Sequence, residues 1–219
     1  MVTKSESIHI LIFRQTFNQN HKFLLKFHQN ISRRADIMTS LREMQLDDLF
    51  KFNSLVLDPH TEVYSLKFFL THLLKWPELS QIAVAPGPGG RRVGYIFGKY
   101  LESKLYEWHG HVCALTVSDD YRRTGVATLL MRHIARALDA KGALYVDLFL
   151  RCSNRPALSL YSSLGYVLRR TVLDYYPDEP VPENAYNMRK PLARDVLRRS
   201  VAVVYTVPQC LSEDDSGDH

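Results

Sequence analysis

Apolar residues recur along the middle of the chain with two different spacings. Over residues 65–75 they lie three and four positions apart, which is typical of a helix with one buried face, and Pro77 ends that pattern. Similar spacing predicts helices over 128–140 and 155–164, and a short helix over 46–52. Short apolar runs predict strands over residues 39–43, 81–85, 93–100, 107–117, 144–150, 166–175 and 186–190.

The order of these elements indicates an α/β protein with a mixed central sheet and flanking helices. The strands predicted over 81–85 and 93–100 flank a turn of proline and glycine, residues 86–90, and so form a hairpin. After the hairpin, strands and helices alternate, as they do when helices cover the faces of a sheet.

We expect one domain, residues 38–200, between two extensions. Residues 1–37 carry +4 of the net charge of +5, which predicts a flexible basic extension, although a basic segment poor in acid also fits a mitochondrial transit peptide. A third interpretation is that translation starts at Met38. Residues 201–219 are polar and acidic, which predicts a disordered tail.

Composition narrows the classes of function. Residues 38–219 carry a charge of only +1, so charge gives no reason to expect nucleic-acid binding, and no apolar run is long enough to span a membrane. The three cysteines, Cys113, Cys152 and Cys210, lack metal or redox spacing, and their odd number fits a reducing compartment, so we expect a cytoplasmic protein. His109 and His111 share one face of a strand, but no third ligand has motif spacing, so no metal site is predicted.

Six residues, Arg122 to Ala127, join a predicted strand to a predicted helix. The first N–H groups of a helix have no partner within it, and the helix dipole adds partial positive charge there. Gly125 and Ala127 keep bulky side chains away from this backbone. The turn therefore predicts an anion site suited to a pyrophosphate, although a helix start with solvated arginines also fits these residues.

A second segment follows the next predicted strand. It comprises Arg151-Cys152-Ser153-Asn154-Arg155-Pro156-Ala157, Leu160-Tyr161 and Leu164-Gly165-Tyr166. Together the two segments resemble the GNAT acetyltransferase superfamily, in which the first motif holds the pyrophosphate of acetyl-CoA and the second carries an Asn and a Tyr near the cofactor. The resemblance implies the GNAT fold, a mixed sheet whose two central strands splay apart around the cofactor.

The resemblance also assigns roles to individual residues. Those expected to bind the cofactor are Arg122, Arg123, Gly125, Val126 and Ala127 at the pyrophosphate, Asn154, and the main chain of Leu115 and Val117 at the pantetheine arm. Tyr161 would lie beside the cofactor sulfur and act as the general acid. From the residues alone, Asn154 also fits a helix N-cap, and Tyr161 also fits the apolar face of a helix.

Residues 38–200 more narrowly resemble the catalytic subunits of NatB. The similar segments are Leu57-Asp58-Pro59, Thr61-Glu62, Tyr64, Trp76-Pro77-Glu78, Glu107 to Val112, Val146 to Phe149, Asp174-Tyr175-Tyr176 and Ala185 to Lys190. This resemblance implies a protein N-terminal acetyltransferase that modifies Met followed by Asp, Glu, Asn or Gln. It also implies a helical-repeat auxiliary subunit, contacted in part by the helix over 65–75, and nascent polypeptide N-termini at the ribosome as substrates.

The same resemblance predicts a peptide groove. Glu62 and Tyr64 would form one wall, with Glu62 attracting the α-ammonium group or relaying its proton, and Tyr175 and Tyr176 would form the other. His111 would bind the second residue of the substrate through an imidazole N–H. A solvated loop and aromatic residues packed at strand ends are the alternative interpretations of these positions.

Two other functions remain open from the sequence. The chain could be a GNAT enzyme for an internal lysine or a small amine, or a diverged paralogue that binds the auxiliary subunit without catalysing the reaction. The second alternative fits Cys113 and the extra residues 1–37. Against it, the cofactor residues are all retained. The loop at 177–182 borders the predicted groove and departs from NatB relatives, which leaves the substrate range open.

Cys113 gives a first testable prediction, because it stands where NatB relatives usually carry threonine. A thiol is a much weaker hydrogen-bond donor than a hydroxyl. If this position helps to hold an acidic substrate side chain, the substitution Cys113→Thr should raise kcat/KM for a Met-Asp peptide. Steady-state kinetics with that peptide test this, and an unchanged or lower value would remove Cys113 from the specificity argument.

Overall fold

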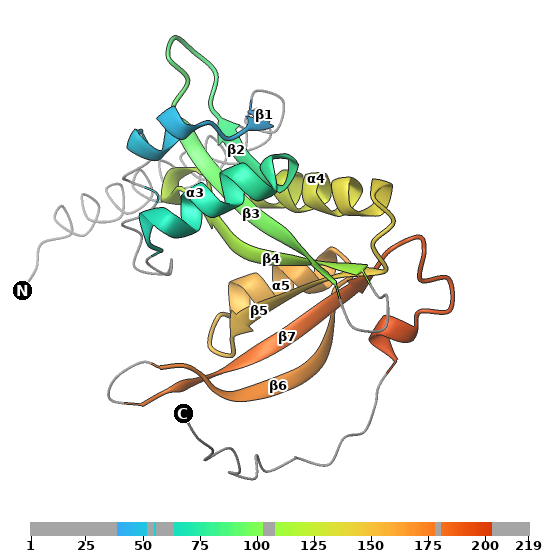
Figure 1. Cartoon of the computed structure of the whole chain (residues 1–219). Helices are drawn as coiled ribbons and strands as arrows, with labels where there is room; N and C mark the ends of the chain where they lie inside the picture. Colours follow the sequence, from blue (N-terminus) through green and yellow to red (C-terminus); the bar gives the residue numbers. More distant parts are fainter. Residues whose placement is uncertain (1–38, 52–54, 56–63, 103–107, 178–180, 203–219) are drawn as a thin grey trace, which may run out of the picture.

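The computed structural model of the chain describes residues 39–51, 55, 64–102, 108–177 and 181–202. They contain a seven-stranded sheet in the order β1-β2-β3-β4-β5-β7-β6, with helices on both faces (Figure 1). Within these residues β4 and β5 run parallel, and the other neighbouring strands run antiparallel. The predicted mixed sheet with flanking helices is therefore confirmed. The predicted extension 1–37 lies outside the described residues, as does the predicted tail 201–219 except for Val201 and Ala202.

The bounds of the elements are as follows. The strands are β1 Ser40–Glu43, β2 Ser80–Val84, β3 Arg92–Glu102, β4 Trp108–Val117, β5 Tyr145–Arg151, β6 Val167–Tyr176 and β7 Glu183–Pro191. The α-helices are α3 Leu66–Lys75, α4 Val126–Ala140 and α5 Arg155–Ser163. Short 3-10 helices are η1 Leu46–Phe50, η2 Pro77–Leu79, η3 Asp119–Tyr121 and η4 Arg199–Val201. No helix among the described residues is both long and apolar enough to cross a membrane.

Three predicted elements differ from the structure. Helix α4 begins at Val126, two residues before the predicted start at Thr128, because Gly125 already serves as its N-cap. The short helix after β1 is a 3-10 helix and not an α-helix. The last strand is nine residues long and not short, because β7 lies between β5 and β6 and pairs with both along its length.

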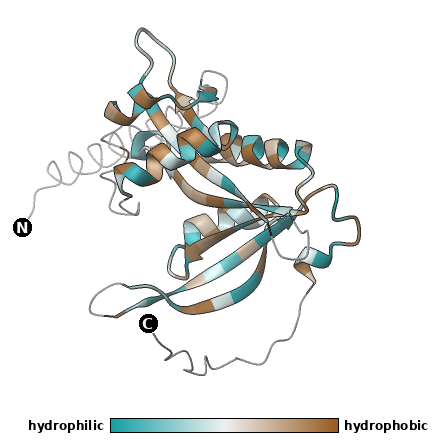
Figure 2. Cartoon of the chain, viewed as in Figure 1, coloured by the Kyte–Doolittle hydropathy of each residue, from teal (hydrophilic) through white to brown (hydrophobic). Residues whose placement is uncertain are grey.

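The two faces of the sheet carry separate apolar clusters. Helices α4 and α5 cover one face, where Leu130, Ile134 and Tyr161 pack with strand residues such as Ile96 in one buried cluster. Helix α3 covers the other face, where Phe69 packs with aromatic residues of β3 in a second cluster. In Figure 2 the central strands are accordingly brown, while the helices mix brown with teal.

The pairing of β4 with β5 stops half-way along the strands. Their paired residues run from His109 and Tyr145 to Val112 and Leu148. Beyond these, β4 continues to Val117 alongside β3, and β5 continues to Arg151 alongside β7. Figure 1 shows the two strands close together at one end and apart at the other. The splay that the family resemblance implied is therefore present.

A β-bulge in β4 lies where this separation begins. On β3, Phe97 pairs with Ala114 and Gly98 pairs with Val112, so Cys113 is the extra residue. The bulge changes which side chains face which helix. Before the bulge, the even-numbered Val112 packs in the cluster of α4. After the bulge, the odd-numbered Leu115 and Val117 pack in that cluster, and the even-numbered Ala114 packs in the cluster of α3. The strict alternation of a strand is thus reset at Cys113.

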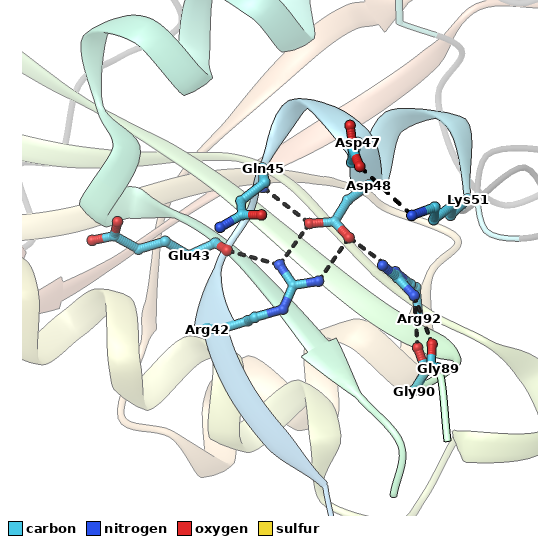
Figure 3. Close-up of polar contacts among 9 residues, drawn as sticks. All are labelled: Arg42, Glu43, Gln45, Asp47, Asp48, Lys51, Gly89, Gly90 and Arg92. Atoms are coloured by element: carbon cyan, nitrogen blue, oxygen red, sulfur yellow. Dashed lines mark hydrogen bonds and ion pairs between the residues drawn. The ribbon is translucent and has the colours of Figure 1, made fainter. Parts of the chain in front are cut away.

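A buried ion cluster ties the N-terminal strand to the β2–β3 hairpin (Figure 3). The Asp48 side chain is 1% exposed, and its two oxygens accept hydrogen bonds from Arg42 at 2.6 and 2.7 Å. Arg92 Nε donates to the same carboxylate at 2.9 Å, as does the backbone N–H of Gln45. Burial alone would raise the pKa of Asp48, but these donors lower it from 3.8 to about 2.

Removal of the Asp48 charge should destabilise the fold, because it leaves Arg42 and Arg92 without their anion. We expect Asp48→Asn to lower the free energy of unfolding at pH 7 by about 2–3 kcal/mol. Because folding lowers this pKa, the stabilisation is complete above pH 3.8 and is lost as the pH falls towards 2. Denaturant titrations at several pH values measure both effects.

Asp47→Asn is the matched control, since Asp47 is 80% exposed and pairs only with Lys51 among the contacts described for it, at 3.7 Å. An exposed pair of this kind contributes about 0.5 kcal/mol or less. An equal decrease in the free energy of unfolding for the two variants would contradict a special role for the Asp48 cluster.

Candidate active site

The loop between β4 and α4 presents an open helix N-terminus. The N-cap of α4 is Gly125, and no side chain caps the helix. Two residues of the loop have a left-handed backbone, Gly125 with φ of 94° and Arg123 with φ of 64°. A non-glycine residue rarely adopts such a φ, and the strain is typical of loops shaped for a ligand. The helix of 15 residues directs its unpaired N–H groups and its dipole towards this loop.

Side chains around the loop hold it in place. Arg122 pairs with Asp119 at 2.9 Å and donates through Nε to the carbonyl oxygen of Val117 at 3.4 Å. Thr124 is buried, and its hydroxyl donates to the carbonyl oxygen of Tyr121 at 2.6 Å. Val126, predicted as a cofactor residue, has its side chain in the core, so it can offer a ligand only its backbone N–H. Arg123 is exposed.

Asn154 is the N-cap of α5. Its Oδ1 accepts a hydrogen bond from the backbone N–H of Ala157 at 3.1 Å. The structure thus places Asn154 in the capping role that its sequence context also allowed. Helix α5 follows β5 directly, so this N-terminus lies at the separated end of β5 just as that of α4 lies at the separated end of β4.

Tyr161 of α5 is buried on the same face of the sheet as α4. It is 9% exposed and packs in the cluster that contains residues of α4, with its ring 5.8 Å from that of Tyr166. Burial raises the pKa of Tyr161 to about 12, so the phenol stays protonated at physiological pH. The predicted general acid is therefore in the protonation state that the role requires.

On the opposite face, Tyr64 is bound to the bulge in β4. Its hydroxyl donates to the carbonyl oxygen of Cys113 at 2.9 Å, and its ring stacks on Phe68 of α3 at 4.1 Å. Glu62, the other residue predicted for this wall, lies outside the described residues. The predicted residues Tyr64 and Cys113 therefore meet at the point where β4 leaves β5.

The Cys113 thiol contacts a buried histidine that the sequence analysis did not single out. His72 Nδ1 lies 2.8 Å from the carbonyl oxygen of Phe68, and His72 Nε2 lies 3.4 Å from Cys113 Sγ. A carbonyl oxygen only accepts, so Nδ1 carries the proton and Nε2 accepts from the thiol. Burial lowers the pKa of His72 and raises that of Cys113 to about 11, which keeps both groups neutral.

His111 forms a short chain of polar side chains with β5 and β7. Its Nδ1 lies 2.7 Å from Asp147 Oδ1, and Asn187 Nδ2 donates to Asp147 Oδ2 at 3.3 Å. Burial alone would raise the pKa of Asp147, but the hydrogen bond and the charge of His111 lower it, so the carboxylate is ionised at neutral pH. Nδ1 of His111 therefore carries a proton.

Aromatic rings connect His111 to the two tyrosines predicted for the far wall. The rings of His111 and Phe149 lie 5.8 Å apart, and Phe149 stacks on Tyr175 at 4.7 Å. Tyr175 meets Tyr176 edge-on at 4.9 Å, and the Arg151 guanidinium lies over the Tyr176 ring. The structure thus brings His111, Tyr175 and Tyr176 together on one surface through Phe149.

No role was predicted from the sequence for Asp147, Phe149 or His72. Asp147 was detectable, because a carboxylate within an apolar strand such as Val146–Phe149 is rarely buried without a partner. Phe149 and His72 carry no such signal, since an aromatic residue in a strand and a histidine in an amphipathic helix are both ordinary packing residues. Their importance comes from neighbours distant in sequence.

Other features of the described residues do not belong to this site. A cavity of about 630 Å³ is lined by Tyr100, Trp108, Lys141 and Arg194, at the paired start of β4 and not at its separated end. No group of three or more potential metal ligands is found among the described side chains.

Comparison with known proteins identifies close relatives. The sequence profile described as "Acetyltransferase (GNAT) family" matches residues 44–166. The "N-terminal acetyltransferase B complex catalytic subunit NAA20" of Arabidopsis thaliana is 45% identical over 165 residues, which are 75% of this chain and 91% of that protein.

Solved structures agree with these sequence matches. The crystal structure of Chaetomium thermophilum Naa20 in complex with a bisubstrate analogue is 40% identical, with a TM-score of 0.68, covering 74% of this chain and 91% of that one. A structure of the NatB acetyltransferase complex bound to CoA and MES contains a chain 36% identical, with a TM-score of 0.64, covering 70% of this chain and 99% of that one.

The loop at α4 can be tested by changing its left-handed glycine. Gly125→Ala should raise the Kd for CoA about tenfold, because an alanine at φ of 94° costs about 1–2 kcal/mol and distorts the open N-terminus. Gly142→Ala is the control, since Gly142 has φ of 75°, follows the other end of α4 and has open space around it. Calorimetric titration should find the Kd for CoA unchanged in the control. An equal rise in this Kd in both variants would argue against an anion site.

Proposed function

This chain belongs to the GNAT acetyltransferase family, among the catalytic subunits of N-terminal acetyltransferase B, and we propose that it acetylates peptides that begin with Met followed by Asp, Glu, Asn or Gln. The chain is an acetyl-CoA-dependent N-terminal acetyltransferase. The observation that carries the substrate proposal is the separation of β4 from β5 after Val112 and Leu148. The loop of residues 122–127, here called the anion loop, and Tyr161 lie on one face of this opening. The bulge at Cys113, His111 and the rings of Phe149, Tyr175 and Tyr176, here called the aromatic surface, lie on the other.

The residues at the opening fit acetyl-CoA. The uncapped N-terminus of α4 suits a pyrophosphate, and the stretch from Leu115 to Val117 has no pairing to β5 and so leaves one strand edge for the amides of a pantetheine arm. Acetyl-CoA supplies the acetyl group as an activated thioester. In this assignment Arg122 shapes the loop that holds the pyrophosphate, and Asn154 starts the helix that carries Tyr161.

Tyr161 supplies a proton in the proposed mechanism. Acyl transfer from a thioester releases a thiolate, which needs a hydrogen-bond donor or a proton as the bond breaks. A phenol whose pKa is about 12 remains a donor throughout the physiological range. Its burial also keeps water away, so the hydrogen bond is stronger than it would be in bulk solvent.

The acceptor amine needs little help to become reactive. An α-amine has a pKa near ~7.8, so a substantial fraction is neutral at physiological pH, whereas a lysine near ~10.4 is almost fully charged. A weak base or a water relay is therefore enough, and Glu62 is the proposed group that attracts the α-ammonium or accepts its proton.

The proposed peptide groove lies on the face of the sheet that α3 shares. Tyr64 and the bulge at Cys113 form one side, and Tyr175 and Tyr176 form the other, joined to the first through His111 and Phe149. His111 is placed to bind the second residue of the substrate, whose carboxylate or amide distinguishes the four accepted sequences.

We also propose an auxiliary subunit of helical-repeat type as the partner, as expected for a subunit of a complex. Helix α3 leaves Leu66 58% exposed and Leu74 82% exposed, and the neighbouring η1 leaves Phe50 72% exposed. Such apolar side chains on a helix beside the groove suit a protein interface. The proposed substrates are nascent chains at the ribosome, and the proposed location is the cytoplasm.

Acetyl-CoA turnover with a panel of acceptors tests the substrate proposal. The panel contains Met-Asp-Glu, Met-Asn, Met-Leu, Ser- and internal-lysine peptides, each assayed with and without the auxiliary subunit. Turnover restricted to the first two supports the proposal. Turnover of another acceptor indicates a different groove specificity, and CoA binding without any turnover indicates a non-catalytic paralogue.

Tyr161→Phe provides a test of the proton donor. The substitution removes one hydroxyl and keeps the ring that packs in the core, so we expect kcat to fall about 100-fold while the Kd for acetyl-CoA changes little. Tyr166→Phe is the control, since Tyr166 is also buried and its ring lies next to that of Tyr161. A similar loss of kcat in both variants would point to packing and not to proton donation.

A further inference from the structure

Asp147 is the buried centre of the polar chain that ends at His111. It is 6% exposed, and it accepts from His111 Nδ1 at 2.7 Å through one oxygen and from Asn187 at 3.3 Å through the other. Asn187 is 1% exposed and also donates to the carbonyl oxygen of Leu148, which fixes its orientation. A buried carboxylate held in this way has little freedom, so the imidazole bound to it is fixed as well.

The location of these linked polar side chains is as informative as their contacts. His111 and Asp147 are partners in the register of β4 and β5, one pair before the last pair of these strands. The carboxylate therefore sits at the closed end of the opening in the sheet, next to the bulge at Cys113. No interaction with His111 Nε2 is found among the described residues, so this nitrogen remains available to a ligand.

We propose that Asp147 is a positioning residue that binds His111 through Nδ1 and thereby makes Nε2 discriminate between acidic and amide side chains at the second residue of the substrate. The inference rests on the proposed function. With Nδ1 bound to the carboxylate, a charged imidazole donates from Nε2 to the carboxylate of Asp or Glu. A neutral imidazole has no proton on Nε2 and accepts instead from the amide of Asn or Gln.

Titratable and charged groups on several elements face this imidazole. They are His109 and Cys113 on β4, Lys99 opposite His111 on β3, His72 on α3, Asp147 on β5 and Arg189 opposite Asp147 on β7. Among these, Asp147 is the group that binds His111 Nδ1 directly, at 2.7 Å.

The discrimination should depend on pH, because imidazoles change charge between about pH 5 and 8. The ratio of kcat/KM for a Met-Asp peptide to that for a Met-Asn peptide should fall about five- to tenfold as the pH rises from about 6 to about 8.5. Titration of the α-amine and of the enzyme's proton donor affects both peptides equally and cancels in the ratio. The measurement uses the full chain with its auxiliary subunit and two peptides that differ only in the second residue.

Asp147→Asn tests the role of the carboxylate itself. The variant keeps the shape of the side chain but removes its charge, so the Met-Asp to Met-Asn ratio should fall about tenfold at pH 7. Asp48→Asn is the matched control, because it also neutralises a buried aspartate that binds cations, but far along the chain from the site. Its ratio should equal that of the unmodified protein.

Each outcome decides between a positioning and a merely structural role. A kcat/KM ratio that is constant with pH in the unmodified protein overturns the proposal. An equal fall in kcat/KM for both peptides in Asp147→Asn overturns it as well. The pH series on the unmodified protein remains decisive even if the variant does not fold. Turnover of neither peptide, with turnover of another acceptor, overturns the proposed substrate class and this inference with it.

Discussion

The candidate site depends on an interruption in the central sheet. Two parallel strands, β4 and β5, pair from His109 to Val112 and then diverge, while each remains paired to its outer neighbour. The helices that follow the two strands therefore begin on either side of the same opening. Ligands of open α/β sheets bind at the carboxyl ends of the strands for this reason. Without the divergence, the loop before α4 and the surface around His111 would be separated by a continuous layer of backbone.

Much of this arrangement follows from local sequence. The apolar spacing of α3 and α4, the proline and glycine turn of the β2–β3 hairpin and the glycine before α4 each determine a local conformation, and those elements were predicted within a few residues. The motif Arg122–Ala127 and the segment around Asn154 were also recognisable, because an open helix N-terminus and a helix cap depend on residues next to one another in the chain.

The remaining features arise from contacts between distant segments. The bulge at Cys113 lies in an apolar strand with no glycine at that position, and only the register of β4 with β3 reveals it. The length of β7 depends on having partners on both sides, which its own composition does not specify. The bonds from His72 to Cys113 and from Asp147 to His111 join residues more than thirty positions apart. From one sequence Cys113 and His111 could be singled out, but their partners His72 and Asp147 could not.

The bulge also constrains how this family of sequences can vary. Because one extra residue resets the alternation of β4, the strand presents His111 to one face and Leu115 to the other although both are odd-numbered. Deleting a single residue here would rotate the rest of the strand by half a turn and exchange the linings of the two faces. Changes of residue type at this position are therefore compatible with the architecture, whereas a change in length is not. A substitution at Cys113 leaves the alternation of β4 unchanged, whereas an insertion or deletion in the same strand would disturb the linings of both faces at once.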